Sequence, residues 1–115
     1  MCQLYISADP RLYHSRSRSV RLHGMVTSIR LENQFWEILD RMALEERTTT
    51  PRLIGTLHDE LLTQRGVVEN FASFLRVCCI RFEEWRLKAL AALPQARAGL
   101  ERPTRPAGIR SPVPV

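Results

Sequence analysis

Residues 25–36 read Met-Val-Thr-Ser-Ile-Arg-Leu-Glu-Asn-Gln-Phe-Trp, and this stretch combines a short strand with the start of a helix. Ser28 and Arg30 alternate with Ile29 and Leu31, a period of two that predicts a half-buried strand. An isolated strand leaves its backbone donors and acceptors unpaired, so this one needs a second strand. We find no second stretch with a convincing alternation of the same kind. The sequence therefore predicts an intertwined homodimer, in which two copies of this strand form an intermolecular two-stranded antiparallel ribbon.

Three amphipathic helices are expected after the strand, because apolar residues recur at helical spacing. The first covers about residues 32–47 and the second about residues 51–64. The sequence Thr48-Thr49-Thr50-Pro51 separates them, since threonine is a good N-cap and proline is tolerated in the first turn of a helix. The third helix covers about residues 69–88. The predicted fold class is therefore mainly α with one short β-strand.

The chain of 115 residues has the length of one domain, and its excess of positive charge lies in two flanks. Residues 1–24 carry four arginines and one aspartate, which predicts a basic N-terminal arm. Residues 25–88 form the predicted domain and are nearly neutral. Residues 89–115 are rich in proline and arginine, which predicts a disordered tail. The formal net charge of +5 favours polyanionic partners such as nucleic acid.

Cysteine usage and hydropathy indicate the compartment. Three cysteines, two of them adjacent, make no disulfide framework, which favours a reducing cytoplasm over secretion. The N-terminus lacks the basic and apolar regions of a signal peptide, and no apolar run reaches the length of a membrane span. We therefore expect a cytoplasmic protein with no membrane partner.

The sequence contains little that indicates catalysis or cofactor binding. His14, His23 and His58 have no metal-ligand spacing with one another or with cysteine. Cys78 and Cys79 lie inside the third amphipathic helix, where we expect one in the core and the other at its periphery. There is no glycine-rich phosphate loop and no nucleophile elbow. We expect no enzymatic activity, no metal site and no cofactor.

Several separated motifs resemble one family in order and spacing. They are Arg18-Ser19-Val20-Arg21-Leu22-His23-Gly24, Thr27-Ser28-Ile29-Arg30-Leu31-Glu32, Phe35-Trp36 and Asn70-Phe71-Ala72-Ser73-Phe74-Leu75-Arg76. The chain is similar over roughly residues 1–85 to the ribbon-helix-helix DNA-binding domain family, in particular to a bacterial subfamily with an additional C-terminal helix. In this family the paired strands lie in the major groove of DNA.

The resemblance implies different roles for the two faces of the strand. Val26, Ser28 and Arg30 would face the bases, and the guanidinium fork of Arg30 suits guanine O6 and N7. The valine departs from a polar surface, although its methyl groups can touch a thymine methyl. The other face and the helices would form the dimer core, made of Thr27, Ile29, Leu31, Phe35, Leu39 and Ile54.

The resemblance also implies phosphate contacts outside the ribbon. Thr49, Thr50 and Arg52 stand at the start of the second helix, where free N–H groups and the helix dipole favour an anion. Pro51 removes one donor there. Arg18 and Arg21, in the basic arm, are further candidates for phosphate binding. Arg47 occupies a position where related sequences usually have a turn glycine, so we expect that turn to close differently.

The function expected from these observations is sequence-specific binding of double-stranded DNA by a homodimer that acts as a bacterial transcriptional regulator. Two alternatives remain open. The first is a protein–protein interaction module, either antitoxin-like or a dimerising adaptor, with a partner-binding face on the third helix. The second is a degenerate fold that dimerises, in which Val26 and Pro51 reflect lost DNA binding.

Overall fold

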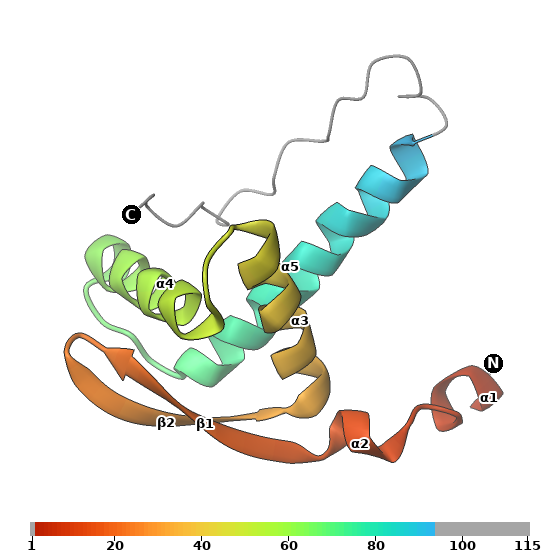
Figure 1. Ribbon diagram of the computed structural model, residues 1–115, viewed down its shortest axis with the longest axis horizontal. Helices are drawn as coiled ribbons and strands as arrows, with labels where there is room; N and C mark the ends of the chain where they lie inside the picture. Colours follow the sequence, from red (N-terminus) through yellow and green to blue (C-terminus); the bar gives the residue numbers. More distant parts are fainter. Residues whose placement is uncertain (1, 94–115) are drawn as a thin grey trace.

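The computed structural model describes residues 2–93 and shows a β-hairpin lying against three helices (Figure 1). Two short helices precede the hairpin and project away from it in the same view. The structure does not describe residues 94–115, so most of the predicted tail lies outside it. The elements in chain order are α1 (Cys2–Ile6), α2 (Pro10–Tyr13), β1 (Ser15–Leu22), β2 (Met25–Glu32), α3 (Asn33–Glu45), α4 (Thr50–Arg65) and α5 (Phe71–Ala92).

The hairpin is antiparallel, and its strands pair over their whole length, from Ser15 opposite Glu32 to Leu22 opposite Met25. The two residues between them, His23 and Gly24, have φ angles of 54° and 82°. Positive φ at both central residues is typical of a type I′ turn, whose twist matches the twist of the flanking strands. The two-residue loop therefore sets the register of the ribbon.

The prediction that β2 has no partner strand in its own chain is wrong, because residues 15–22 pair with it. The homodimer stays a prediction. Residues 15–22 belong to the predicted basic N-terminal arm of residues 1–24, and in the structure they form β1. The strand was missed because Arg18 lies on the helix-facing side of β1, on the same face as buried Val20. The alternation of a half-buried strand would place an apolar residue at this position. The ribbon is thus formed within one chain.

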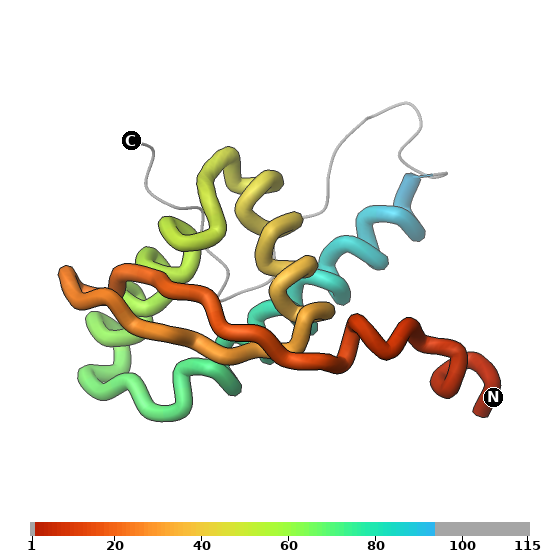
Figure 2. The backbone as a smooth tube through the Cα atoms, turned by 60° about the horizontal axis from the view of Figure 1, so that its bottom comes forward, coloured from red at the N-terminus to blue at the C-terminus, as the bar shows by residue number. Residues whose placement is uncertain are grey.

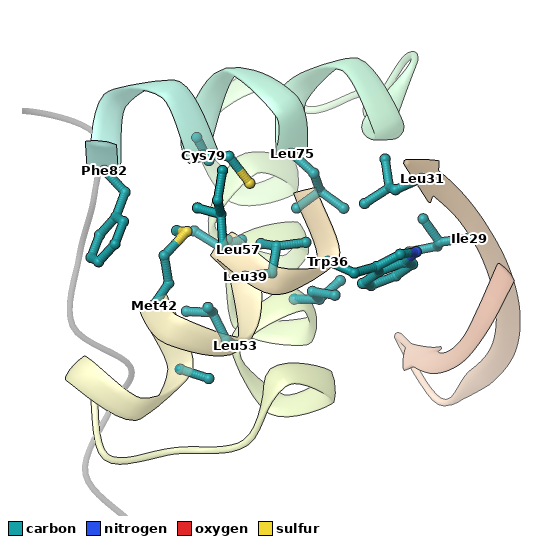
Figure 3. Packing of buried hydrophobic residues seen from close by; sticks show 14 of the residues in the cluster. Ile29, Leu31, Trp36, Leu39, Met42, Leu53, Leu57, Leu75, Cys79 and Phe82 are labelled. Atoms are coloured by element: carbon teal, nitrogen blue, oxygen red, sulfur yellow. The ribbon is translucent and has the colours of Figure 1, made fainter. Parts of the chain in front are cut away.

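The three predicted helices are confirmed with small shifts of their ends, and α5 continues to Ala92, beyond the predicted end. Together with the hairpin, the three helices enclose one hydrophobic core (Figure 3). Its almost fully buried residues include Leu31, Trp36, Leu39, Ile54, Leu75 and Cys79. The side chains of α5 pack against α3 within the same copy. Ile29, Leu31, Leu39 and Ile54 are therefore buried in a single copy, while Thr27 and Phe35 are half-buried.

The turn between α3 and α4 closes in the way that a glycine would allow. Arg47 has φ 57°, in the left-handed region. The N–H of Thr48 donates to the carbonyl oxygen of Ala43 at 2.9 Å, and the N–H of Arg47 donates to that of Leu44 at 3.1 Å. The first of these bonds is the long-range bond of a Schellman motif, which usually has glycine at the left-handed position. The expectation of a different turn is therefore wrong, and Arg47 adopts the strained conformation itself.

Arg47→Gly should raise the free energy of unfolding by about 1 kcal/mol, because a side chain at positive φ is strained and glycine is not. Chemical denaturation followed by circular dichroism measures the change. Gly66, with φ 79° after α4, provides the reverse control, and Gly66→Ala should destabilise the protein by a similar amount. A loss of stability in Arg47→Gly would show that the arginine side chain contributes more than its backbone strain costs.

Within the described residues, no helix is long and apolar enough to cross a membrane. The same part of the chain holds no group of three or more metal-ligating side chains placed to bind a metal ion. The thiols of Cys78 and Cys79 are buried, and desolvation raises their pKa values to about 11 and about 12. Both cysteines therefore belong to the core as neutral thiols, and neither lies at its periphery as one was expected to.

Candidate nucleic-acid interface

The face of the hairpin that points away from the helices is polar and basic. Val20, Ile29 and Leu31 are buried on the opposite face, and side chains alternate along each strand, so the residues between them face solvent. Figure 2 shows both strands in front of the helices. Six exposed side chains form this surface, which we name the outward face: Ser17, Ser19, Arg21, Val26, Ser28 and Arg30.

The outward face is arranged in three cross-strand rows. Ser17 lies opposite Arg30, Ser19 opposite Ser28, and Arg21 opposite Val26. Arg30 makes no side-chain hydrogen bond or ion pair within residues 2–93, and Arg21 donates one bond, of 3.2 Å, to the carbonyl oxygen of Gly24. Two arginines and three hydroxyl groups are therefore presented on a surface that contains no carboxylate.

Glu32 follows Arg30 on β2, but its carboxylate is engaged elsewhere. Nε of Arg76 in α5 donates to Oε1 of Glu32 at 2.9 Å, and this hydrogen bond lowers the pKa of Glu32. The pairing holds β2 to α5 and compensates the negative charge of Glu32. Arg30 therefore remains available to an external anion or base.

Arg18 lies on the helix-facing side of β1, away from the outward face. Its Nη1 donates to Oδ1 of Asp40 in α3 at 3.0 Å, and its guanidinium carbon lies 4.8 Å from the centre of the Trp36 ring. The indole N–H of Trp36 donates to the carbonyl oxygen of Arg16 at 2.9 Å. These contacts attach β1 to α3, so the position of Arg18 favours a structural role over the predicted phosphate contact.

The start of α4 already has an anionic partner from the same chain. The hydroxyl of Thr50, which is 7% exposed, donates to Oδ1 of Asp40, so the Asp40 carboxylate lies beside this helix end. The hydroxyl of Thr49 accepts the N–H of Arg52 at 3.4 Å and caps the helix. Pro51 has no N–H. Of the three residues predicted to bind phosphate here, only Arg52 has an exposed side chain without a hydrogen-bond or ion-pair partner among residues 2–93.

Comparison with known proteins agrees with this architecture. The model of the ribbon-helix-helix domain family matches residues 15–82, from the first residue of β1 into α5. The chain belongs to the ribbon-helix-helix family. A similar solved structure is that of an uncharacterized protein from Bordetella pertussis Tohama I, with 36% sequence identity and a TM-score of 0.74. The match covers 96% of this chain and 82% of that one. A search of curated proteins finds no match.

The ribbon-helix-helix fold brings some of the predicted site residues together and separates others. Val26, Ser28 and Arg30 share the outward face, as the alternation along β2 predicts. Arg21 joins them from β1, whereas Arg18 and Thr50 both donate to Asp40, away from the outward face. Sequence reasoning missed Ser17 and Ser19.

A signal for those two serines was present in the sequence. Ser17, Ser19 and Arg21 occupy every second position before the His23-Gly24 pair. This pair suits a tight hairpin turn. Recognising the turn would have placed them on the same face as Ser28 and Arg30.

Proposed function

We propose that this ribbon-helix-helix protein binds duplex DNA through the outward face and acts as a transcriptional regulator. The observation that carries the proposal is the combination of two available arginines and three hydroxyl groups, without a carboxylate, on a regular two-stranded ribbon. A ribbon of two strands fits the major groove, where every base pair presents a distinct pattern of donors and acceptors. DNA binding is also common in the family, and the net charge of +5 favours a polyanion.

The side chains on the outward face suit distinct contacts. Arg30 can donate two parallel hydrogen bonds to guanine O6 and N7. Ser28 can donate to or accept from several bases, and Val26 can pack against a thymine methyl group. Arg52 is exposed at the start of α4 and supplies positive charge for a phosphate. Base contacts provide specificity in this scheme, and phosphate contacts provide position and affinity.

Arg30→Ala should reduce discrimination between a selected target and random duplex DNA by about 10- to 100-fold, the contribution of one bidentate arginine–guanine contact. Fluorescence anisotropy with labelled duplexes measures both affinities, and repeating it at several salt concentrations tests for a log–log slope near −0.9 per phosphate contact. Lys88→Ala is the control, because Lys88 is an exposed cation on α5. Equal discrimination by the variant and the wild type would exclude Arg30 from base recognition.

A protein–protein interaction module is the alternative that one observation favours. Val77, Ile80 and Leu87 follow helical spacing on α5, and each is more than half exposed. Neighbouring exposed apolar side chains of this kind often mark a protein contact. Absence of duplex binding at low salt, together with loss of a complex on Ile80→Arg, would support this alternative over DNA binding.

A further inference from the structure

The two strands of the hairpin carry the same short motif. Residues 19–22 of β1 read Ser-Val-Arg-Leu, and residues 28–31 of β2 read Ser-Ile-Arg-Leu. The only difference is between valine and isoleucine, which are both β-branched. The repeat places a serine and an arginine on the outward face of each strand and a β-branched residue on the buried face, where Val20 is 4% and Ile29 6% exposed.

The register of the hairpin relates the two motifs by a twofold axis. Ser19 lies directly opposite Ser28, so the axis passes between these two residues. Rotation by 180° about it exchanges the strands and moves Arg21 onto the position of Arg30. The two arginines therefore lie on opposite strands, at opposite ends of the outward face. The symmetry is broken at its margins, where Ser17 corresponds to Val26.

This pseudosymmetric ribbon is complete within one chain. β1 packs against α4, and a Cβ at Gly55 of that helix would lie 3.4 Å from the carbonyl oxygen of Arg21. Trp36 and Arg18 attach the other half of β1 to α3. β2 leads directly into α3 and is held to α5 through Glu32. Both strands are thus fixed to the helices of their own copy, and neither needs a second copy for its position.

We propose that one copy of this protein reads a short inverted repeat in duplex DNA by itself, with Arg21 and Arg30 each contacting a guanine in opposite halves of the site. The inference rests on the proposed DNA binding and specifies the class of site. Arg21 and Arg30 stand two rows apart, four residues along a strand. At about 3.4 Å per residue this separation is roughly 14 Å, or about four base-pair steps of DNA. Arg21 is therefore a base contact in this proposal, in place of the phosphate contact predicted from the sequence.

The test combines selection of bound duplexes from a random pool with the stoichiometry of the complex. We expect wild-type protein to bind one chain per site by native mass spectrometry and to select an inverted repeat. Arg21→Ala and Arg30→Ala should each lose one of the two conserved guanines and keep the other, with similar losses of about 10- to 100-fold in affinity for the wild-type site. The double variant should lose both. Circular dichroism melting verifies that the variants, which change exposed side chains, remain folded.

A different pattern would overturn the proposal without removing DNA binding. If a homodimeric ribbon were built from two β2 strands, the complex would contain two chains. Arg30→Ala would then affect both halves of the site, and Arg21→Ala would affect neither. Absence of any duplex binding at low salt would instead overturn both the proposed function and this inference, so the two failures are distinguishable.

Discussion

Replacing Trp36 with alanine will lower the free energy of unfolding by about 3–5 kcal/mol, the usual loss for truncating a large buried aromatic residue. The ring is 0% exposed and lies between α3 and the strands, beside Ile29 and Leu31 (Figure 3). Its N–H donates to the carbonyl oxygen of Arg16, and the Arg18 guanidinium covers its face. Alanine would remove the packing, the hydrogen bond and the cation–π contact together. Urea denaturation followed by far-ultraviolet circular dichroism measures the loss.

Trp36→Phe separates the packing from the polar contacts. Phenylalanine keeps most of the buried ring but removes the indole N–H that donates to the carbonyl oxygen of Arg16, so we expect a smaller loss, of about 1–3 kcal/mol. Both variants should weaken the attachment of β1 in particular, because the contacts of Trp36 with Arg16 and Arg18 are made on that strand. Hydrogen exchange tests this point. If the β1 amides of Trp36→Ala were as protected as those of the wild type, the residue would not be what holds the strand in place.

Local patterns were sufficient to predict the helices and β2. The apolar spacing along α3, α4 and α5 predicts each helix to within a few residues, because each turns one face toward a common core. The alternation along β2 also predicts which side chains are exposed. In both cases the sequence pattern arises because one face of the element is buried. Apolar residues therefore recur with the period of the helix or of the strand.

The partner strand was missed because its inward positions are not all apolar. Arg18 faces the helices as a cation on Trp36 and Asp40, and a sequence pattern cannot show that such an aromatic and a carboxylate lie within reach. The dimer was then inferred from an apparent lack of pairing that the hairpin removes. Counting strands by hydrophobic alternation fails where an ion pair replaces an apolar contact.

The start of α4 illustrates a second limit of sequence reasoning. Thr49 and Thr50 stand where a helix N-terminus favours an anion, and the sequence places the expected residues there. Asp40 lies in the preceding helix, and only the turn through Arg47 brings its carboxylate to Thr50. We infer that the Asp40 carboxylate, which also pairs with Arg18, makes this helix end less receptive to phosphate. If the protein binds DNA as proposed, we expect the affinity to come mainly from the ribbon and from exposed arginines such as Arg52.

Ser28→Glu should weaken binding of a selected duplex by at least about 100-fold, because a carboxylate placed at the centre of the proposed DNA-binding surface would face the negative potential of the groove. Ser28 lies beside the pseudo-twofold axis of the hairpin, opposite Ser19 and one row from each arginine. The new carboxylate would also pair with Arg21 or Arg30 and compete with the DNA for them. The fold should survive, because the residue is exposed and its neighbours on that face are polar or cationic except for Val26.

Lys88→Ala is again the matched control, because it lowers the net charge by the same amount on α5, whose C-terminal half extends away from the hairpin (Figure 1). If affinity followed net charge alone, the two variants would bind equally weakly. If the outward face is the contact surface, Ser28→Glu loses binding and Lys88→Ala remains within a few-fold of the wild type. Measuring both across a range of salt concentrations separates the local effect, which persists at moderate salt, from long-range attraction, which screening removes.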